Sequence, residues 1–226
     1  MPSIGELIRS GRAFVAERWG FILVATVGVP MLISILSGVF EKALGDSLLM
    51  AAVNIAAFAL SLVVSLGVKR ITLDLVDGKP SEFADLFSQA NLFWKFLWAS
   101  IVYGVVVVIG FILLIIPGVY LSLKYGFFGY ILVDRPELSA MDALKESARL
   151  TDGIKWNLLW FSLALLGINF LGLLALGIGL LYTVPVSIMA YTALYRSLTR
   201  IGGTPTEEVV SSETAPAPEI IETPAA

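Results

Sequence analysis

Lys124 is the charged residue whose position in the sequence most suggests chemistry. It lies within a long apolar stretch, where an ionisable side chain is costly and therefore often marks a binding site or an ion pathway. No Asp or Glu lies within the uncharged runs 19–40, 47–68, 96–123 and 156–195, so its expected partners are water, backbone carbonyls, or the amides of Asn54 and Asn169. These three residues form the predicted contact site for a lipid or a small substrate.

A structural interpretation of the same three residues is also open. The ammonium of Lys124 can reach the outer interface of a bilayer along its flexible stem. Asn54 and Asn169 can form hydrogen bonds between neighbouring helices, which is the common role of asparagine in lipid.

Two aspartates occupy matching places at the ends of predicted helices. Asp77 lies in Val76-Asp-Gly-Lys-Pro80 and Asp134 lies in Val133-Asp-Arg-Pro136. Together they could form a paired carboxylate site for a metal or for acid-base chemistry. Aspartate before proline is also an ordinary turn former. Because no further ligands accompany the pair, we prefer the turn interpretation.

The sequence contains no cysteine and no histidine. This excludes disulfides, thiolate or imidazole metal ligands, and any nucleophile activated by a histidine base. We predict no catalytic residue, no bound cofactor and no metal, and therefore a protein that is not an enzyme. No feature of the sequence points to nucleic acid.

The elements that must position these side chains are membrane helices. Hydrophobic residues make up 58% of the 226 positions and charged residues 15%, whereas soluble domains have roughly 45–50% and 25%. The uncharged run 156–195 is long enough to cross a bilayer twice and must turn near Gly172, Gly177 and Gly179. A second turn is expected at Ile116-Pro117-Gly118, because proline removes a backbone donor.

The fold class is therefore all-α: a polytopic membrane protein with six transmembrane helices in three hairpins. These helices form a single domain over residues 1–200. The predicted spans lie near 19–40, 47–76, 93–116, 118–134, 155–174 and 178–200.

The basic residues predict the orientation of these spans. Relative to the uncharged runs 19–40, 47–68, 96–123 and 156–195, thirteen of the 15 Lys and Arg residues fall on one side of the predicted membrane, and only Lys42 falls in a loop on the other side. By the positive-inside rule, both termini and both long loops should be cytoplasmic.

Three short amphipathic segments should form helices along the inner surface, near 4–15, 82–90 and 139–150. Ser3 with Glu6 fits a capping box, and Ser139 with Asp142 fits a weaker one. In the third segment, Met141 and Leu144 should face the bundle and Lys145 should face water. Two interpretations of these segments stay open: they mark three parallel repeats, or they are the polar connecting segments that any polytopic protein needs.

The last segment, residues 201–226, is rich in Pro, Thr, Ala and Glu and has no aromatic residue. Such a composition buries too little apolar surface to become ordered. We predict a disordered, acidic, cytoplasmic tail.

The stretch from Ile116-Pro-Gly-Val-Tyr-Leu-Ser-Leu-Lys-Tyr-Gly-Phe127 through Leu132-Val-Asp-Arg-Pro136 to Leu150-Thr-Asp-Gly-Ile-Lys-Trp156 resembles a family of uncharacterised prokaryotic membrane proteins. These are the YciC-like proteins, which are related to the membrane domain of some glycerophosphoryl diester phosphodiesterases. The resemblance is most specific over residues 110–160 and extends over 1–200. It implies a multi-pass protein of the cytoplasmic (inner) membrane, and it supplies no catalytic motif.

Two roles follow as predictions. The first is a non-enzymatic accessory or scaffold protein, with membrane lipids and a membrane or cytoplasmic protein partner bound through the short cytoplasmic helices and the tail. The second is a small transporter or permeation unit with its polar site at Lys124. A lipid-modifying enzyme is a third possibility.

Overall fold

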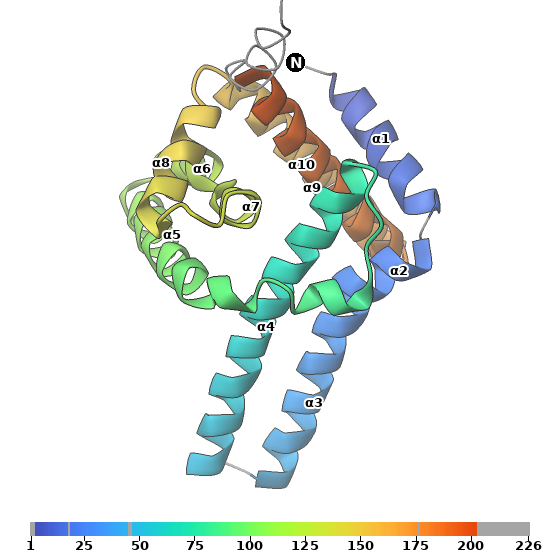
Figure 1. Cartoon of the computed structure of the whole chain (residues 1–226), viewed down its shortest axis with the longest axis vertical. Coiled ribbons are helices and arrows are strands. Elements are labelled where there is room, and N and C mark those ends of the chain that lie inside the picture. Colours follow the sequence, from blue (N-terminus) through green and yellow to red (C-terminus); the bar gives the residue numbers. More distant parts are fainter. Residues whose placement is uncertain (1–2, 18, 45–46, 176, 203–226) are drawn as a thin grey trace, which may run out of the picture.

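The computed structural model describes residues 3–17, 19–44, 47–175 and 177–202, and every regular element in these ranges is a helix (Figure 1). The predicted all-α class is therefore confirmed. The elements are α1 (Ile4–Glu17), α2 (Trp19–Leu23), η1 (Val24–Gly28), α3 (Val29–Leu44), α4 (Leu48–Val76), η2 (Phe83–Leu86), η3 (Ala90–Leu92), α5 (Phe93–Leu113), α6 (Ile115–Tyr125), α7 (Phe128–Asp134), α8 (Ala140–Leu150), α9 (Lys155–Leu174) and α10 (Leu180–Gly202).

Within the described residues, five helical segments are long and apolar enough to cross a membrane. They are Gly20–Glu41, Leu48–Val76, Phe83–Leu113, Ile115–Asp134 and Lys155–Leu174. The chain thus has the helices of a multi-pass membrane protein. The sixth predicted span corresponds to α10, which is not one of these five segments; its last two turns contain Arg196 and Arg200.

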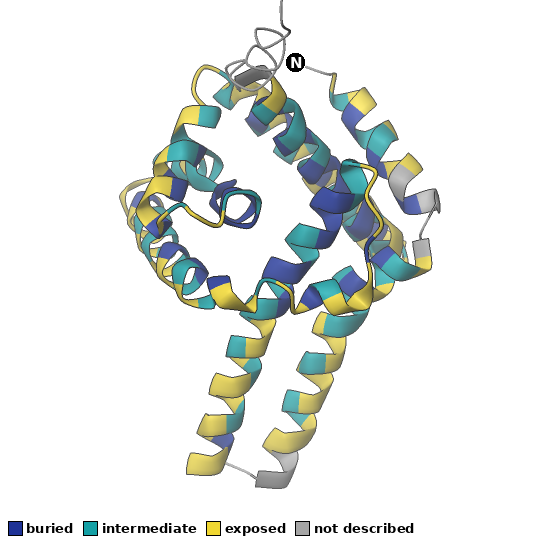
Figure 2. Ribbon diagram, in the orientation of Figure 1, coloured by how far each residue is buried: buried dark blue, intermediate teal, exposed yellow. Residues whose placement is uncertain are grey.

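Large apolar side chains cover the outside of the helices. Figure 2 shows exposed residues along the lower halves of α3 and α4, which extend as a pair away from the rest of the chain. Leu32 and Phe58 on this pair are 56% and 57% exposed. Exposing so many apolar side chains to water is unfavourable, whereas contact with lipid tails is not.

The turns between consecutive helices follow from local sequence. Between α9 and α10 the chain turns at Gly177, whose φ of +76° favours glycine, as predicted. Between α5 and α6 the turn is at Leu114, which has extended backbone, and not at Ile116-Pro117-Gly118. The prediction failed there because Pro117 lies in the first turn of α6, where its missing N–H would have had no partner in any case.

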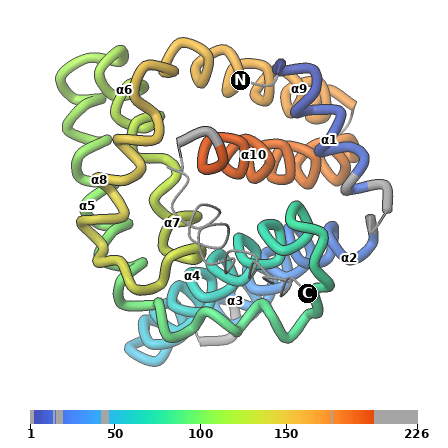
Figure 3. Tube along the Cα trace, turned by 45° about the horizontal axis from the view of Figure 1, so that its top comes forward, coloured from blue at the N-terminus to red at the C-terminus, as the bar shows by residue number. Residues whose placement is uncertain are grey.

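Helix α7 lies at the centre of the molecule, between α4, α5 and α8 (Figure 3). Six consecutive residues of α7, from 128 to 133, are all buried. The fourth predicted span, 118–134, is interrupted at Gly126 and Phe127, which divide it into α6 and α7. The centre of the core is therefore a short helix that is apolar all round, as expected of a fully buried element.

The three predicted amphipathic segments are helical, although not all in the expected way. Residues 4–17 and 140–150 are α-helices, whereas the middle segment forms only 3₁₀ turns at Phe83–Leu86 and Ala90–Leu92. Rather than lying on a surface alone, α1 packs lengthwise against α10: a Cβ on Gly11 would lie 2.8 Å from the carbonyl oxygen of Val186.

The predicted helix caps are confirmed. The backbone N–H of Ser3 donates to Glu6 at 2.8 Å, and that of Glu6 donates to the Ser3 hydroxyl at 3.3 Å. The Ser139 hydroxyl accepts from the N–H of Asp142 and caps α8.

The predicted orientation of α8 is half right. Leu144 is buried and Lys145 is exposed, but Met141 is 46% exposed and does not face the bundle, because Ala140 and Ala143 occupy that face. The predicted tail from Gly203 onward lies outside the described residues.

Candidate functional site

Asp77 and Asp134 come together as their matching positions in the sequence suggest, but a guanidinium joins them. Arg196 on α10 donates to Asp77 at 2.6 Å and to Asp134 at 2.7 Å. The hydroxyl of Tyr195 donates to the second oxygen of Asp134 at 3.0 Å. The sequence analysis missed Arg196, which it counted only as an inner basic residue, so neither the metal site nor the simple turn describes this cluster.

The Arg196 cluster ties three helix ends together. Asp77 follows the last residue of α4, Asp134 ends α7, and Arg196 lies near the end of α10. The three charged side chains are only 17–21% exposed. A planar guanidinium with two separate donor edges is suited to hold two carboxylates at once. The cluster therefore holds the ends of α4, α7 and α10 together.

Lys124 lies in the last turn of α6, at the same level as the turn before α9. Its Nζ is 5.3 Å from the centre of the Tyr125 ring. The pKa of Asp152 is lowered chiefly by a hydrogen bond from Lys155, and the charge of Lys124 makes a smaller contribution. Lys124 therefore lies near the turn before α9, and its reach toward the outer interface stays a prediction.

The structure does not bring Lys124 together with the two asparagines. Asn169 on α9 donates to the carbonyl of Leu165 at 2.9 Å and to the hydroxyl of Ser187 on α10 at 2.8 Å. This is the interhelical contact proposed as the structural interpretation. Asn54 lies on the exposed half of α4. A ligand role for these three residues stays a prediction.

A second half-buried cation of the bundle is Lys69 on α4. Its Nζ donates to the hydroxyl of Ser65 at 2.9 Å and lies 5.2 Å and 5.8 Å from the ring centres of Phe96 and Tyr130. A Cβ on Gly129 would lie 2.8 Å from Cε of Lys69, so the absence of a side chain at position 129 makes room for the stem. Among the described residues, these contacts include no carboxylate.

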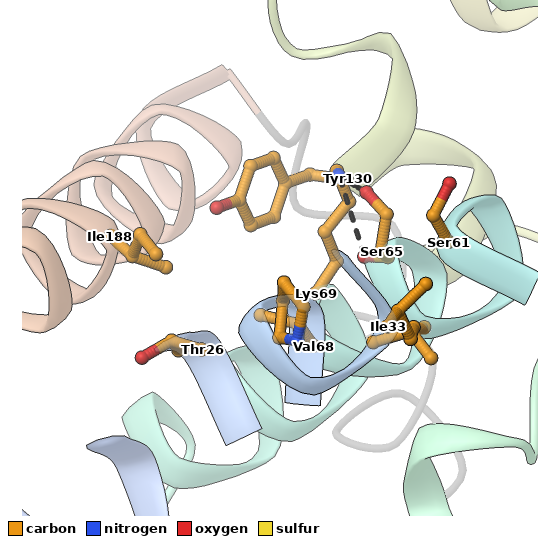
Figure 4. A pocket seen from close by; sticks show the side chains of 10 residues that line it. Thr26, Ile33, Ser61, Ser65, Val68, Lys69, Tyr130 and Ile188 are labelled. Atoms are coloured by element: carbon orange, nitrogen blue, oxygen red, sulfur yellow. Dashed lines mark hydrogen bonds between the residues drawn. The ribbon is translucent and has the colours of Figure 1, made fainter. Parts of the chain in front are cut away.

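The direction of the Lys69 side chain is informative. The nearer end of α4, at Val76, is about 10 Å away along the helix axis. The ammonium instead turns back toward Ser65, one turn nearer the middle of the helix (Figure 4). This is the opposite of snorkelling, in which the stem carries the charge to the closest interface.

Lys69 lines two adjoining cavities. One, of about 350 Å³, lies toward η1, α3 and α4, and Figure 4 shows Thr26, Ser61 and Ser65 around it. The other, of about 430 Å³, is a wide-open hollow toward α5, α6 and α10, called the second cavity below. Lys69, Tyr130 and Ile188 line both. The second cavity is also lined by four further hydroxyl groups, those of Tyr103, Ser122, Ser187 and Tyr191.

The break between α6 and α7 lies at the wall of this second cavity. Gly126 lines it, and a Cβ there would lie 2.8 Å from the hydroxyl oxygen of Tyr191. The groups freed by the break are satisfied from α8: the Ser147 hydroxyl accepts from the N–H of Phe127 and donates to the carbonyl of Lys124, both at 3.1 Å. Interrupted helices in membrane proteins are tolerated where protein or a cavity surrounds them.

Two kinds of chemistry could use this arrangement. The Ser65 hydroxyl and Lys69 amine are close enough to act as nucleophile and base. Such a reaction also needs donors for the developing oxyanion, yet the nearby hydroxyls of Thr26 and Ser61 donate to carbonyls of their own helices. An ammonium surrounded by hydroxyls and aromatic rings is better suited to bind an anion.

Glu146 on α8 provides a pH-dependent contact outside the spans. Hydrogen bonds from Arg149 at 2.7 and 2.8 Å, followed by the charges of Arg149 and Arg135, lower the pKa of Glu146 below its usual 4.5. A carboxylate whose pKa is lower in the folded state stabilises the fold above its unfolded pKa and loses that effect as the pH falls through the folded value.

When the pH is lowered from about 6 to about 3, we therefore expect the unfolding temperature of Glu146→Gln to fall less than that of the wild type. Thermal unfolding in detergent at each pH measures this, with the exposed Glu137→Gln as the matched control. A Glu146→Gln variant that parallels the wild type at every pH would contradict the assignment.

Comparisons with known proteins agree with this class of molecule. Residues 100–201 match the family described as "Protein of unknown function (DUF975)". The matched segment runs from α5 through α10 and so includes one wall of the second cavity, together with Asp134 and Arg196, but not Lys69.

The chain is also similar to the "Uncharacterized protein Rv2560" of Mycobacterium tuberculosis (strain ATCC 25618 / H37Rv). The two are 32% identical over 155 residues, which is 69% of this chain and 46% of the relative. The chain thus spans about half the length of this curated relative. No solved structure matches the chain.

These matches relate the chain to the DUF975 family over residues 100–201 and to a distant homologue without an assigned role. Neither match names a biochemical role; the candidate membrane helices are a finding of the structure. The finer resemblance to the YciC-like proteins stays a prediction.

Proposed function

We propose that this chain is a multi-pass membrane protein that binds an anionic ligand with an apolar body at Lys69. The observation that carries the proposal is the inward direction of the Lys69 ammonium, which faces two adjoining hollows and, among the described residues, contacts the hydroxyl and carbonyl oxygens of Ser65 and two aromatic rings but no carboxylate. The Asp77 and Asp134 carboxylates pair with Arg196 instead.

The chemistry of the cavity walls supports this class of ligand. A positive charge in a medium of low dielectric constant attracts an anion far more strongly than it would in water. The Tyr191 hydroxyl can donate to carboxylate or phosphate oxygens, whereas the Ser122 hydroxyl donates to the carbonyl of Val119 at 2.8 Å. Aliphatic side chains such as Val64 and Ile188 line the remaining wall and suit an apolar body.

This arrangement favours the second predicted role, a transporter or permeation unit, with the polar site at Lys69 rather than Lys124. The accessory or scaffold role and the absence of enzymatic activity stay predictions. We also propose that α10 is the sixth span and that the ends of α4 and α10 near Asp77 and Arg196 face the cytoplasm. Lys69 would then point from the inner boundary toward the middle of the bilayer.

The proposal is tested with two amphiphiles of equal chain length and opposite charge, dodecyl phosphate and dodecyltrimethylammonium. We expect dodecyl phosphate to raise the unfolding temperature of the full chain, because a ligand at 100 times its Kd stabilises by about 2.7 kcal/mol. The cationic amphiphile should not. Inorganic phosphate alone serves as a third arm, which shows whether the apolar body is required.

Lys69→Met should abolish the effect of dodecyl phosphate, and Lys124→Met should retain it. Both substitutions remove one ammonium from an apolar stretch, so the comparison isolates the position of the charge. A wild type that does not respond, or a Lys69→Met variant that responds as strongly as the wild type, would refute the proposal.

A further inference from the structure

A second binding surface lies on the outside of the bundle, between α6 and α9. It is a groove of about 750 Å³ with walls formed by the first residues of α9 and by the lipid-exposed side of α6. Ile115 and Ile116 at its far end are 73% and 81% exposed. From there to Leu123 the groove follows α6 for about 12 Å. Among its lining residues, this groove shares Leu123 with the second Lys69 cavity, and Lys69 itself does not line it.

Charged groups are confined to the other end of the groove. Lys155 Nζ donates to the hydroxyl of Tyr120 at 2.8 Å and to the carboxylate of Asp152 at 3.0 Å, and it lies 4.8 Å from the centre of the Tyr120 ring. The side chain of Lys155 is 26% exposed, whereas that of Asp152 is 78% exposed. The ammonium is thus held within the groove, and the carboxylate lies at its rim.

A phospholipid matches this groove, which is apolar along α6 and charged at Lys155. Its acyl chain fits the apolar length along α6, and its phosphate would lie at Lys155 and Tyr120, where the groove becomes polar. The indole of Trp156, which is 74% exposed beside Lys155, suits the interfacial region of a bilayer. The lowered pKa of Asp152 keeps this carboxylate ionised at neutral pH.

The placement of Lys155 within the groove and Asp152 at its rim favours some phospholipid headgroups over others. A net anionic headgroup would gain at Lys155 but be repelled by Asp152. A headgroup with phosphate first and an ammonium further out meets both charges with the opposite sign. A primary ammonium can also donate hydrogen bonds to the carboxylate, which a quaternary ammonium cannot. We infer that the α6–α9 groove is a site for an aminophospholipid of the phosphatidylethanolamine type.

The inference is tested by native mass spectrometry of the full chain released from nanodiscs. The nanodiscs contain equal parts of phosphatidylethanolamine, phosphatidylcholine and phosphatidylglycerol with identical acyl chains. We expect the wild type to retain phosphatidylethanolamine over each of the others by about two- to fivefold, as suits a partly exposed ion pair.

Asp152→Asn should abolish this preference, whereas Asp142→Asn should keep it. Asp142 is a matched control because it forms the same kind of pair, three residues from Lys145, but on the exposed side of α8. Val119→Trp, which fills the groove without changing a charge, should reduce the retention of all three lipids. Unfolding temperatures recorded for every variant identify any that fail to fold.

Equal retention of the three lipids by the wild type, or a preference for phosphatidylglycerol, would overturn the inference. So would a folded Asp152→Asn variant that keeps the preference. Because none of these outcomes depends on Lys69, they are distinguishable from a failure of the proposed anion site.

Discussion

Replacing Arg196 with leucine is expected to lower the free energy of unfolding by about 2–4 kcal/mol, since it leaves two partly buried carboxylates facing each other without a cation. Arg196→Lys should recover only part of the loss, because an ammonium cannot present two donor edges to Asp77 and Asp134 at once. Equilibrium unfolding in mixed micelles measures both variants.

Arg149→Leu is the matched control for Arg196→Leu. Arg149 also pairs with a carboxylate, but its side chain is 61% exposed, and exposed pairs contribute about 0–1 kcal/mol. Neutralising the two carboxylates in the background of Arg196→Leu should restore stability, because no uncompensated charge remains. If Arg196→Leu were as mild as Arg149→Leu, the Arg196 cluster would not brace the three helices.

Replacing Lys69 with methionine is expected to have the opposite effect, raising stability by about 1–2 kcal/mol in the absence of ligand. A half-buried ammonium without a carboxylate partner is costly, and methionine fills a similar volume without a charge. A side chain that lowers the stability of the unliganded protein is typical of a binding residue.

The same unfolding experiment checks this prediction, with Lys124→Met alongside. Lys124 lies at the end of α6 beside the Tyr125 ring, so its removal should change stability little. If Lys69→Met destabilised the protein by as much as Arg196→Leu, the ammonium would be a structural element, and the anion site would lose its main support.

Local sequence was sufficient for much of the fold. The helix caps at Ser3 and Ser139 and the turn at Gly177 depend on residues within a few positions of one another, and these were predicted. The turn between α5 and α6 was misplaced because it depends on packing. Pro117 can end a helix or begin one, and here Gly118 lies against Gly110 of α5, so Pro117 begins α6.

The candidate site depends on distant pairings that spacing alone does not show. Arg196 meets Asp77 across 119 positions of sequence. Lys69 was counted among inner basic residues, although it falls well inside the predicted span 47–76; its place in that span, four residues after Ser65, was the available signal. Lys124 attracted attention because its neighbours in sequence are apolar, but its neighbours in space include the Asp152 turn.

The anion site can be tested most directly without knowing the ligand. Because the sequence has no cysteine, a Ser122→Cys variant carries one thiol, placed at the wall of the second cavity. Its rates of reaction with an anionic sulfonate and a cationic trimethylammonium methanethiosulfonate of equal length report the local potential.

We predict that the sulfonate reacts faster than the trimethylammonium reagent at Ser122→Cys and that adding Lys69→Met removes this difference. Ser88→Cys, on the exposed loop before α5, should show no dependence on Lys69. A thiol at position 122 that does not react with either reagent, or a charge preference that survives Lys69→Met, would contradict the account.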